Sequence, residues 1–347
     1  MIYRYIFILT VLAVALGFSG KAQAETAISN YALIDTAHFP GSVRWDYLTF
    51  DTQNHHLFIT RGDSVDVWDT DGEKIVATIP NLEGTHGVAI ADDLNKGFIT
   101  EGKANRVTVF DLTTLKTTLT VPTETKPDAI VYDPATGRVF AANGESGSLT
   151  AINAKDGAVI ATIKLDGKPE FAVVDGKGRL YVNLEDKAKL AVVDTKKLSV
   201  KTRYDLAATC EEPTGLAIDA AKRRLFSVCG NKVMVITDGK TGKVIDTLPI
   251  GAHSDAAIFD SGTGLAFSSN GDGTLTVAAP NDPDHYQVVQ TVETKPTART
   301  MALDPATHRI YLVAAEPEDT DPPTAEHPDP RPHMKPDSFM LLTVGQK

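Results

Sequence analysis

Residues 126–163 read KPDAIVYDPATGRVFAANGESGSLTAINAKDGAVIATI and contain one complete unit of a repeat. The unit opens with an apolar segment that ends at Asp133, and three further runs of strand length follow it. Thr-Gly and Asp-Gly pairs separate some of these runs, which is typical of β-hairpins. The stretch therefore predicts four short antiparallel strands, and it shows no helical periodicity.

The same unit returns along the whole chain. Its spacing is 41 to 44 residues, measured between the closing aspartates Asp51, Asp92, Asp133, Asp175, Asp219, Asp260 and Asp304. Four strands in about 40–45 residues is the period of a propeller blade. Seven copies therefore predict an all-β fold, a seven-bladed β-propeller of four-stranded blades, built as a single domain over residues 25–347.

The seventh unit is one strand short. Strands are expected near residues 300–303, 309–313 and 339–344, after which the chain ends. One apolar strand, residues 31–35, precedes the first unit and belongs to none. Pairing it with residues 339–344 would complete the last blade and remove two open sheet edges. We therefore expect the N-terminal strand to close the ring.

Residues 315–337 depart from the repeat and form an insertion rich in proline and acidic residues, in the turn between strands 2 and 3 of the seventh blade. This composition predicts a mobile or polyproline-like loop that overhangs one mouth of the channel and could act as a lid over it. His327 and His333 have carboxylates beside them, but their uneven spacing makes a weak metal motif.

The first 24 residues predict a secretory signal peptide. Arg4 precedes a short apolar run, and Ala22-Gln23-Ala24 supplies the small-x-small cleavage pattern. The run is shorter than the roughly 20 residues that span a bilayer, which argues against a membrane anchor. We expect a monomeric, periplasmic or secreted protein with no membrane span after cleavage.

The charge balance bears on the partner. Removing residues 1–24 takes away Arg4 and Lys21 and no acidic residue, so the net charge changes from −11 to −13. A field of this sign repels phosphate backbones, so nucleic acid is disfavoured as the main partner unless one face is locally basic. A small molecule or a protein of the cell envelope fits the composition better.

The repeats resemble a known family. Residues 137–163 and 178–194 read like repeats of the YVTN-type, or YncE-like, seven-bladed propellers. The likeness covers about residues 30–345. The resemblance implies the propeller fold and leaves the function open, because such propellers carry many functions.

One ring of positions is the candidate binding site. Inner strands of a propeller start at one face, around the mouth of the central channel. Alignment on the closing aspartates places at these starts Asp46, Gly87, Asp128, Glu170, Thr214, Asp255 and Arg299. Their polar or aromatic neighbours are Trp45, His86 and Glu212. Convergent polar groups of this kind either bind a cation, a polar ligand or a partner, or simply line a water-filled channel.

The chain has two cysteines, Cys210 and Cys229. Cys210 falls in the linker before the fifth unit, and Cys229 falls at the end of strand 2 of that unit. Both positions belong to the mouth face, so we expect a bracing disulfide, with two small buried thiols as the alternative.

Three functions remain open. The absence of a G-x-S-x-G elbow, an H-E-x-x-H helix, a P-loop and a C-x-x-C-H motif favours a non-catalytic binding or scaffolding protein. The second is a metal-dependent hydrolase of the lactonase type, with a divalent cation on Asp128, Glu170 and Asp255 and His86 as base. A quinoprotein-like dehydrogenase is weaker, since only Trp45 and Trp68 could stack on a planar cofactor.

Overall fold

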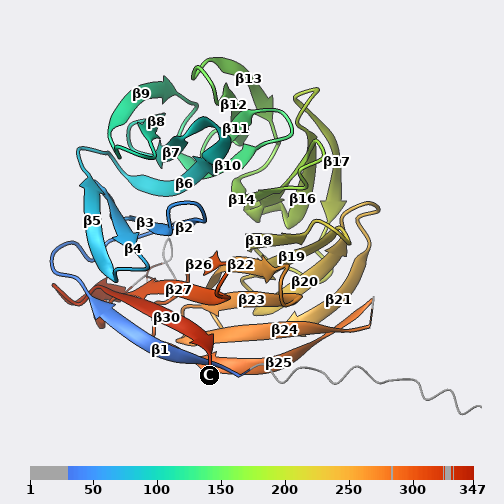
Figure 1. Ribbon diagram of the computed structural model, residues 1–347. Helices are drawn as coiled ribbons and strands as arrows, with labels where there is room; N and C mark the ends of the chain where they lie inside the picture. The colour runs from blue at the N-terminus through green and yellow to red at the C-terminus, as the bar shows by residue number, and fades with distance from the viewer. Residues whose placement is uncertain (1–29, 283, 323, 325–329, 331) are drawn as a thin grey trace, which may run out of the picture.

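The computed structural model describes residues 30–347 except 283, 323, 325–329 and 331. Over these residues the strands form seven four-stranded antiparallel sheets, arranged around a central axis, and one two-stranded ribbon (Figure 1). The predicted seven-bladed β-propeller is confirmed. The predicted signal peptide lies outside the described residues.

The blades follow one another along the chain. Blade 1 contains β2 (Leu48–Asp51), β3 (His56–Thr60), β4 (Val65–Asp69) and β5 (Lys74–Ile79). Blade 2 contains β6 (Thr85–Ala91), β7 (Lys96–Glu101), β8 (Arg106–Asp111) and β9 (Thr117–Pro122), with the 3-10 helix η1 (Asp92–Leu94) after β6. Blade 3 contains β10 (Pro127–Asp133), β11 (Arg138–Asn143), β12 (Ser148–Asn153) and β13 (Val159–Lys164). Blade 4 contains β14 (Pro169–Val174), β15 (Arg179–Leu184), β16 (Lys189–Asp194) and β17 (Ser199–Asp205), with η2 (Glu185–Lys187) after β15.

The remaining three blades complete the ring. Blade 5 contains β18 (Pro213–Asp219), β19 (Arg224–Cys229), β20 (Val233–Asp238) and β21 (Val244–Pro249). Blade 6 contains β22 (Ser254–Asp260), β23 (Leu265–Asn270), β24 (Thr274–Asp282) and β25 (His285–Glu293). Blade 7 contains β26 (Met301–Asp304), β27 (Arg309–Ala314), β30 (Met340–Gln346) and β1 (Tyr31–His38).

Blade 7 confirms the expected closure. Its strands lie in the order β1-β30-β27-β26, so the N-terminal strand is the outer strand of a sheet whose other three strands come from the C-terminus (Figure 1). β1 and β30 are antiparallel, with Tyr31 opposite Gln346 and His38 opposite Met340. The two ends of the chain therefore hold one blade together, and β30 has a partner on both sides.

One aromatic residue per blade builds the core. It lies on strand 2 and is buried in every blade: Phe58, Phe98, Phe140, Tyr181, Phe226, Phe267 and Tyr311. These rings pack with aliphatic side chains of neighbouring blades, as Phe140 does in a cluster with Leu180 and Val182 of blade 4. Burial of an aromatic side chain stabilises by about 1.5–3 kcal/mol, so each interface between blades is held largely by this repeat.

The repeated aspartate closes the turn between strands 1 and 2. In blade 3 the carboxylate of Asp133 accepts the backbone N–H of Ala135 at 3.1 Å and the hydroxyl of Thr136 at 2.8 Å. The same pattern recurs at Asp260, which accepts from Gly262 and Thr263. A side chain that replaces a backbone partner in this way defines a tight turn. The aspartates that reveal the repeat are therefore structural.

The insertion is partly ordered into strands. β28 (Pro317–Thr320) and β29 (Pro332–Met334) pair antiparallel as the two-stranded ribbon. The composition did not predict this pairing, because prolines lack the N–H that a ladder uses. His333 lies on β29, with Nε2 3.1 Å from Oδ2 of Asp321, and His327 lies outside the described residues.

The disulfide is confirmed. Cys210 and Cys229 are bonded, with their Cα atoms 5.5 Å apart and a sequence separation of 19. The bond ties the linker before blade 5 to the end of β19. In the described part of the chain, no helix has the length and apolar character needed to cross a membrane.

Candidate functional site

Strand pairing defines the ring of inner-strand starts directly. In six blades the ring position is the residue two positions before the first regular pair of strands 1 and 2, and in blade 6 it is the residue between the pairs of Ser254 and Ala256. The ring positions are Asp46, His86, Asp128, Glu170, Thr214, Asp255 and Arg299. Six of these seven match the sequence alignment. In blade 2 the alignment chose Gly87, one residue too far, because Asp92 lies in η1 and not at the end of the strand.

A bulge turns these side chains toward the axis. The register between strands 1 and 2 shifts at the start of the inner strand in blades 2 to 6, and the ring position falls inside the shift. Such irregularities redirect a side chain and are frequent beside binding sites. The sequence encodes the bulge as Pro127, Pro169 and Pro213, each of which begins an inner strand.

Hydroxyl groups on strand 2 fix the backbone of the ring. The Oγ1 of Thr60 accepts the N–H of Asp46 and donates to the carbonyl of Tyr47, both at 3.1 Å. The Oγ1 of Thr100 donates to the carbonyl of Asp128 at 2.5 Å and accepts the N–H of Gly87 at 2.9 Å. Each bond ties an inner strand to its own blade or to the next one, so the ring positions rest on a rigid frame.

The position after each ring residue closes the channel. Small residues occupy it in most blades, namely Gly87, Ala129, Gly215 and Ala256. Blades 1 and 4 instead place Tyr47 and Phe171 there, and the two rings meet with centroids 5.1 Å apart and planes at 66°. The pair fills the space that the small residues leave. The mouth is therefore a cup with an aromatic floor, and not an open pore.

Space is short at this level of the channel. A Cβ atom at Gly215 would lie 2.6 Å from backbone atoms of Ala256 and Ala257, so only glycine fits where β18 passes β22. This close approach explains why blade 5 contributes no bulky side chain to the floor.

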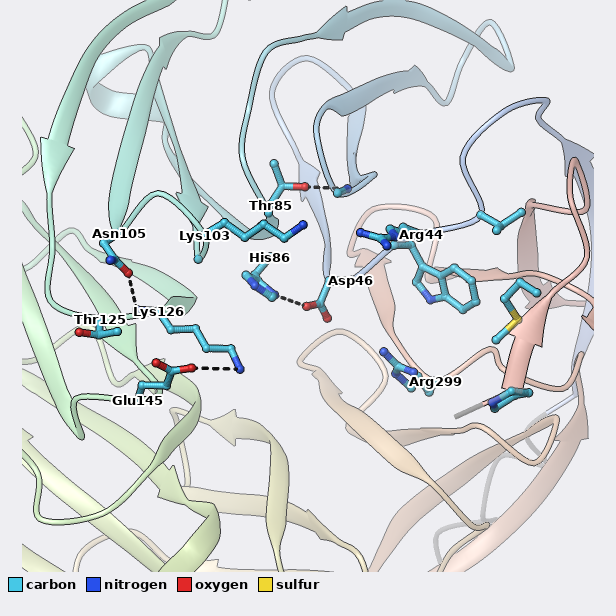
Figure 2. Close-up of a pocket in the computed structure, with 17 residues that line it drawn as sticks. Arg44, Asp46, Thr85, His86, Lys103, Asn105, Thr125, Lys126, Glu145 and Arg299 are labelled. Carbon is cyan, nitrogen blue, oxygen red and sulfur yellow. Dashed lines mark hydrogen bonds and ion pairs between the residues drawn. The ribbon is translucent and has the colours of Figure 1, made fainter. Parts of the chain in front are cut away.

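The cup contains two overlapping hollows. The deeper one, about 510 Å³, is lined by all seven ring residues together with Tyr47, Lys168 and Glu185. The outer one, about 670 Å³, adds Arg44, Trp45, Lys103 and Met334 of the insertion (Figure 2). Asp46, His86 and Arg299 border both, so the two hollows are one continuous site.

The deeper hollow is rich in carboxylates that face one another. His86 lies between two of them, with Nδ1 2.6 Å from Oδ2 of Asp46 and 3.8 Å from Oδ1 of Asp128. Across the ring, Nε of Arg299 donates to Oδ2 of Asp255 at 2.6 Å. Lys168 bonds to Glu185 and lies 3.7 Å from Oε2 of Glu170.

Burial and like charges shift the pKa values here. Burial and the nearby Asp46 raise the pKa of Asp128 to about 6. Burial, with the charges of Asp128 and Glu185, raises the pKa of Glu170 to about 8. Although burial opposes it, the bond to Asp46 and the charge of Asp128 raise the pKa of His86. The deeper hollow thus holds more negative charge than its own cations compensate.

The outer hollow has the opposite sign. The side chains of Arg44, Lys103 and Lys126 converge on the opening from different blades, and Arg299 lies across the opening from Lys126 (Figure 2). Among the described residues, Arg44 and Lys103 form no ion pair, and Lys126 reaches Glu145 only at 4.0 Å. The sequence predicted a polar, carboxylate-rich mouth with a few cations in it; in the structure most of these cations gather at the rim, above the acidic deeper hollow.

The predicted site residues are distributed unevenly. Asp46, His86, Asp128, Glu170 and Asp255 line the deeper hollow with Arg299. Trp45 lines the outer one, and its ring lies 5.8 Å from that of Phe339. Glu212 is exposed and lines neither hollow. Trp68 is buried against Phe39 in the core and is unavailable to a cofactor.

Sequence reasoning missed four important residues of the cup. Tyr47 and Phe171 form the floor, and Lys103 and Lys168 supply cations from the turns between strands. The first two had a usable signal, since two aromatic residues occupy a position that is small in most aligned repeats. The lysines had none, because turns of this kind are polar throughout the chain.

Comparisons with known proteins identify the fold. No family model and no curated protein matches the chain. Among solved structures it is similar to a chain of hydrazine synthase from Kuenenia stuttgartiensis, with 15% identity, 80% of this chain and 94% of that chain covered, and a TM-score of 0.68. It is also similar to a chain of a mitotic checkpoint complex (12% identity, 98% and 99% covered, TM-score 0.74). A third is the WD40 repeats of RRP9 (9% identity, 91% and 99% covered, TM-score 0.75). At these identities the likeness shows the propeller fold alone.

Proposed function

We propose that this chain is an exported binding protein of the YVTN-type propellers, and that the cup at its channel mouth holds a small anionic ligand without transforming it. Export is supported by the signal-like first 24 residues and by the disulfide between Cys210 and Cys229. Family membership rests on the sequence resemblance and on the propeller architecture.

The observation that carries the proposal is the cationic rim. Arg44 and Lys103 point into a hollow of about 670 Å³ without ion pairs among the described residues, in a chain of net charge −11. Cations that converge without partners repel one another, so their placement favours an anion between them. An arginine and a lysine offer a carboxylate or phosphate several charge-assisted hydrogen bonds.

Apolar groups beside the rim define the rest of the ligand. Val43, Trp45 and Met334 line the same hollow, and the indole Nε1 of Trp45 is buried with no hydrogen-bond partner in the described part of the chain. A concave site with apolar walls and few convergent polar groups is the usual form of a small-molecule site. The ligand would combine an acidic group with an apolar or planar portion.

The test is ligand binding by the purified protein. Native mass spectrometry would detect what co-purifies, and melting with citrate, inorganic phosphate or glucose would probe charge. We expect citrate or phosphate, and not glucose, to raise the melting temperature. The double variant Arg44→Ala/Lys103→Ala should lose that shift, while Lys74→Ala on the outer strand of blade 1 should keep it. A shift that survives the double variant would contradict the proposal.

A second function is favoured by one observation. Asp46, His86 and Asp128 offer ligand atoms that all lie within 4.8 Å of one another, as a metal-dependent hydrolase of the lactonase type requires. Hydrolysis of a model lactone by Zn²⁺- or Mn²⁺-supplied protein, lost in Asp128→Asn, would support this second function over simple binding.

A further inference from the structure

We propose that the deeper hollow of the cup binds one divalent transition-metal cation through the side chains of Asp46, His86 and Asp128. This site lies in the acidic deeper hollow, apart from the cationic rim that carries the proposed binding function, and it requires no hydrolysis, although the second function would use the same three residues. It also differs from the set expected from the sequence, which placed the cation on Asp128, Glu170 and Asp255.

The three side chains come from equivalent positions of three successive blades. Oδ2 of Asp46 and Oδ1 of Asp128 lie 2.6 and 3.8 Å from Nδ1 of His86, and all three ligand atoms fall within 4.8 Å of one another. In the described part of the chain, no other group of histidine, cysteine and acidic side chains meets this criterion. The bonds from Thr60 and Thr100 hold the two acidic residues on their strands. A site on rigid strands keeps its geometry when a metal binds.

Tyr47 lines the same hollow and needs a hydrogen-bond partner there. Its side chain is only 6% exposed, and its hydroxyl forms no hydrogen bond to another of the described residues. What fills the hollow beside the three side chains must therefore supply that partner.

Glu170 points to the same space. Its Oε2 is buried and accepts no hydrogen bond in the described residues, and the nearest cation, Lys168, is 3.7 Å away and is already bonded to Glu185. The buried Oε2 of Glu170 and the hydroxyl of Tyr47, neither of them hydrogen-bonded to another described residue, therefore border a hollow with excess negative charge. A bound cation, with its water ligands, would satisfy both.

The donor set selects the class of cation. Two carboxylates and one imidazole suit Zn²⁺, Mn²⁺ or Fe²⁺, whereas Ca²⁺ prefers six to eight oxygen ligands. Three protein ligands leave coordination positions for water or for an acidic group of a ligand held at the rim. The proposal thus gives the cup two complementary parts, a cation below and an anion site above.

The experiment measures metal binding by the mature chain after chelator treatment. Titration with Mn²⁺ or Zn²⁺, followed by calorimetry and elemental analysis, should give one bound ion per chain and a higher melting temperature. Asp128→Asn and His86→Gln should each weaken binding by at least about tenfold. Ca²⁺ should bind more weakly than either transition metal.

Two controls separate this site from the surface. Asp63→Asn removes one exposed carboxylate from a turn between strands 2 and 3 of blade 1, and His333→Gln removes the histidine that lies near Asp319 and Asp321. Both should leave binding unchanged. Loss of Zn²⁺ in His333→Gln, or binding that persists in Asp128→Asn and His86→Gln, would overturn the proposal.

Metal binding in the deeper hollow should not depend on the cations of the rim. The variant Arg44→Ala/Lys103→Ala should still bind Mn²⁺, so failure of anion binding and failure of metal binding are separate results. Asp128→Asn also relieves repulsion from Asp46, so its metal-free melting temperature should not fall. A lower melting temperature with unchanged metal binding would assign Asp128 a purely structural role and overturn the proposal.

Discussion

The two ends of each inner strand behave differently. At the far end, Asp51, Asp133, Asp219, Asp260 and Asp304 repeat the same residue and accept hydrogen bonds from the turn that follows each of them. At the mouth end, the residue changes from blade to blade, and the side chains interact across blades, as His86 does with Asp46 and Asp128. We call the repeated aspartates, together with the strand closure and the disulfide that hold the blades, the frame. We call the variable ring, together with the two hollows beside it, the mouth.

The difference separates structure from function. A residue that recurs with identical partners serves what all blades share, which is the fold. A residue that departs from the repeat and leaves charge uncompensated serves something the fold does not need. Substitutions in the frame should therefore lower the free energy of unfolding, while substitutions in the mouth should change binding with little loss of stability.

Removing β1 should have the largest effect on the frame. A variant that lacks residues 30–38 leaves β30 unpaired along seven positions of its ladder and leaves blade 7 with three strands. We expect the melting temperature to fall by more than about 10 °C, or the protein to aggregate through the open edge. Ile34→Ser, on the exposed side of β1, is the matched control and should melt like the wild type. An unchanged melt in the deletion would mean that the closure contributes nothing.

Removing the disulfide should cause the next largest loss of stability. Cys210→Ala/Cys229→Ala opens a loop with a sequence separation of 19 and should lower the free energy of unfolding by about 3 kcal/mol. Blade 5 gives the deeper hollow only Thr214, so binding of Mn²⁺ and of citrate should be unaffected. Denaturant unfolding with and without reductant measures the loss of unfolding free energy, and calorimetry measures the binding of Mn²⁺ and citrate. A loss of binding with the disulfide would place blade 5 in the mouth and weaken the distinction.

Strand β10 contains one mouth residue and one frame residue, so the two kinds of substitution can be compared within one strand. Asp128 and Asp133 both lie on β10, five positions apart. Asp133→Ala removes a buried acceptor from two donors and should destabilise by about 2 kcal/mol. Asp128→Ala removes a carboxylate that burial and Asp46 disfavour, so its unfolding free energy should change by less than about 1 kcal/mol. Urea unfolding of the two variants measures both changes. Equal losses of unfolding free energy would contradict the distinction between frame and mouth.

The frame could be read from the sequence because it repeats. Asp133, Asp219 and Asp304 each close a turn by the same local hydrogen bonds, so one unit predicts the others. The closure by β1 followed from counting strands, and the disulfide from the aligned positions of its cysteines. The error at Gly87 had a local cause, since η1 displaces Asp92 from the strand end and shifts the alignment by one residue.

The mouth could be predicted only in part. Its ring positions follow from the repeat, but its chemistry depends on contacts between residues far apart in the chain. Tyr47 and Phe171 meet across the axis because blades 1 and 4 face each other, and no local pattern encodes that contact. The cationic rim is equally nonlocal, because Arg44 and Lys103 belong to different blades and converge only when the ring closes.

The smallest expected effect has the opposite sign and depends on pH. The pKa of Glu170 lies near 8 in the folded protein, against 4.5 for an exposed glutamate, because burial and the charges of Asp128 and Glu185 disfavour the ionised form. Below pH about 4.5 the carboxyl is protonated in both states and makes no difference to stability. As the pH rises toward 8 the unfolded chain releases this proton and the folded chain retains it, so the wild type loses stability. Glu170→Gln removes that loss, although the buried amide also lacks a partner, so the net gain at pH 8 should be about 1 kcal/mol or less. Denaturant unfolding of both proteins at pH 4.5 and pH 8 measures the difference. If the variant were less stable than the wild type at pH 8, Glu170 would stabilise the fold like a frame residue. The distinction between frame and mouth would then hold for Asp46, His86 and Asp128 but not for Glu170.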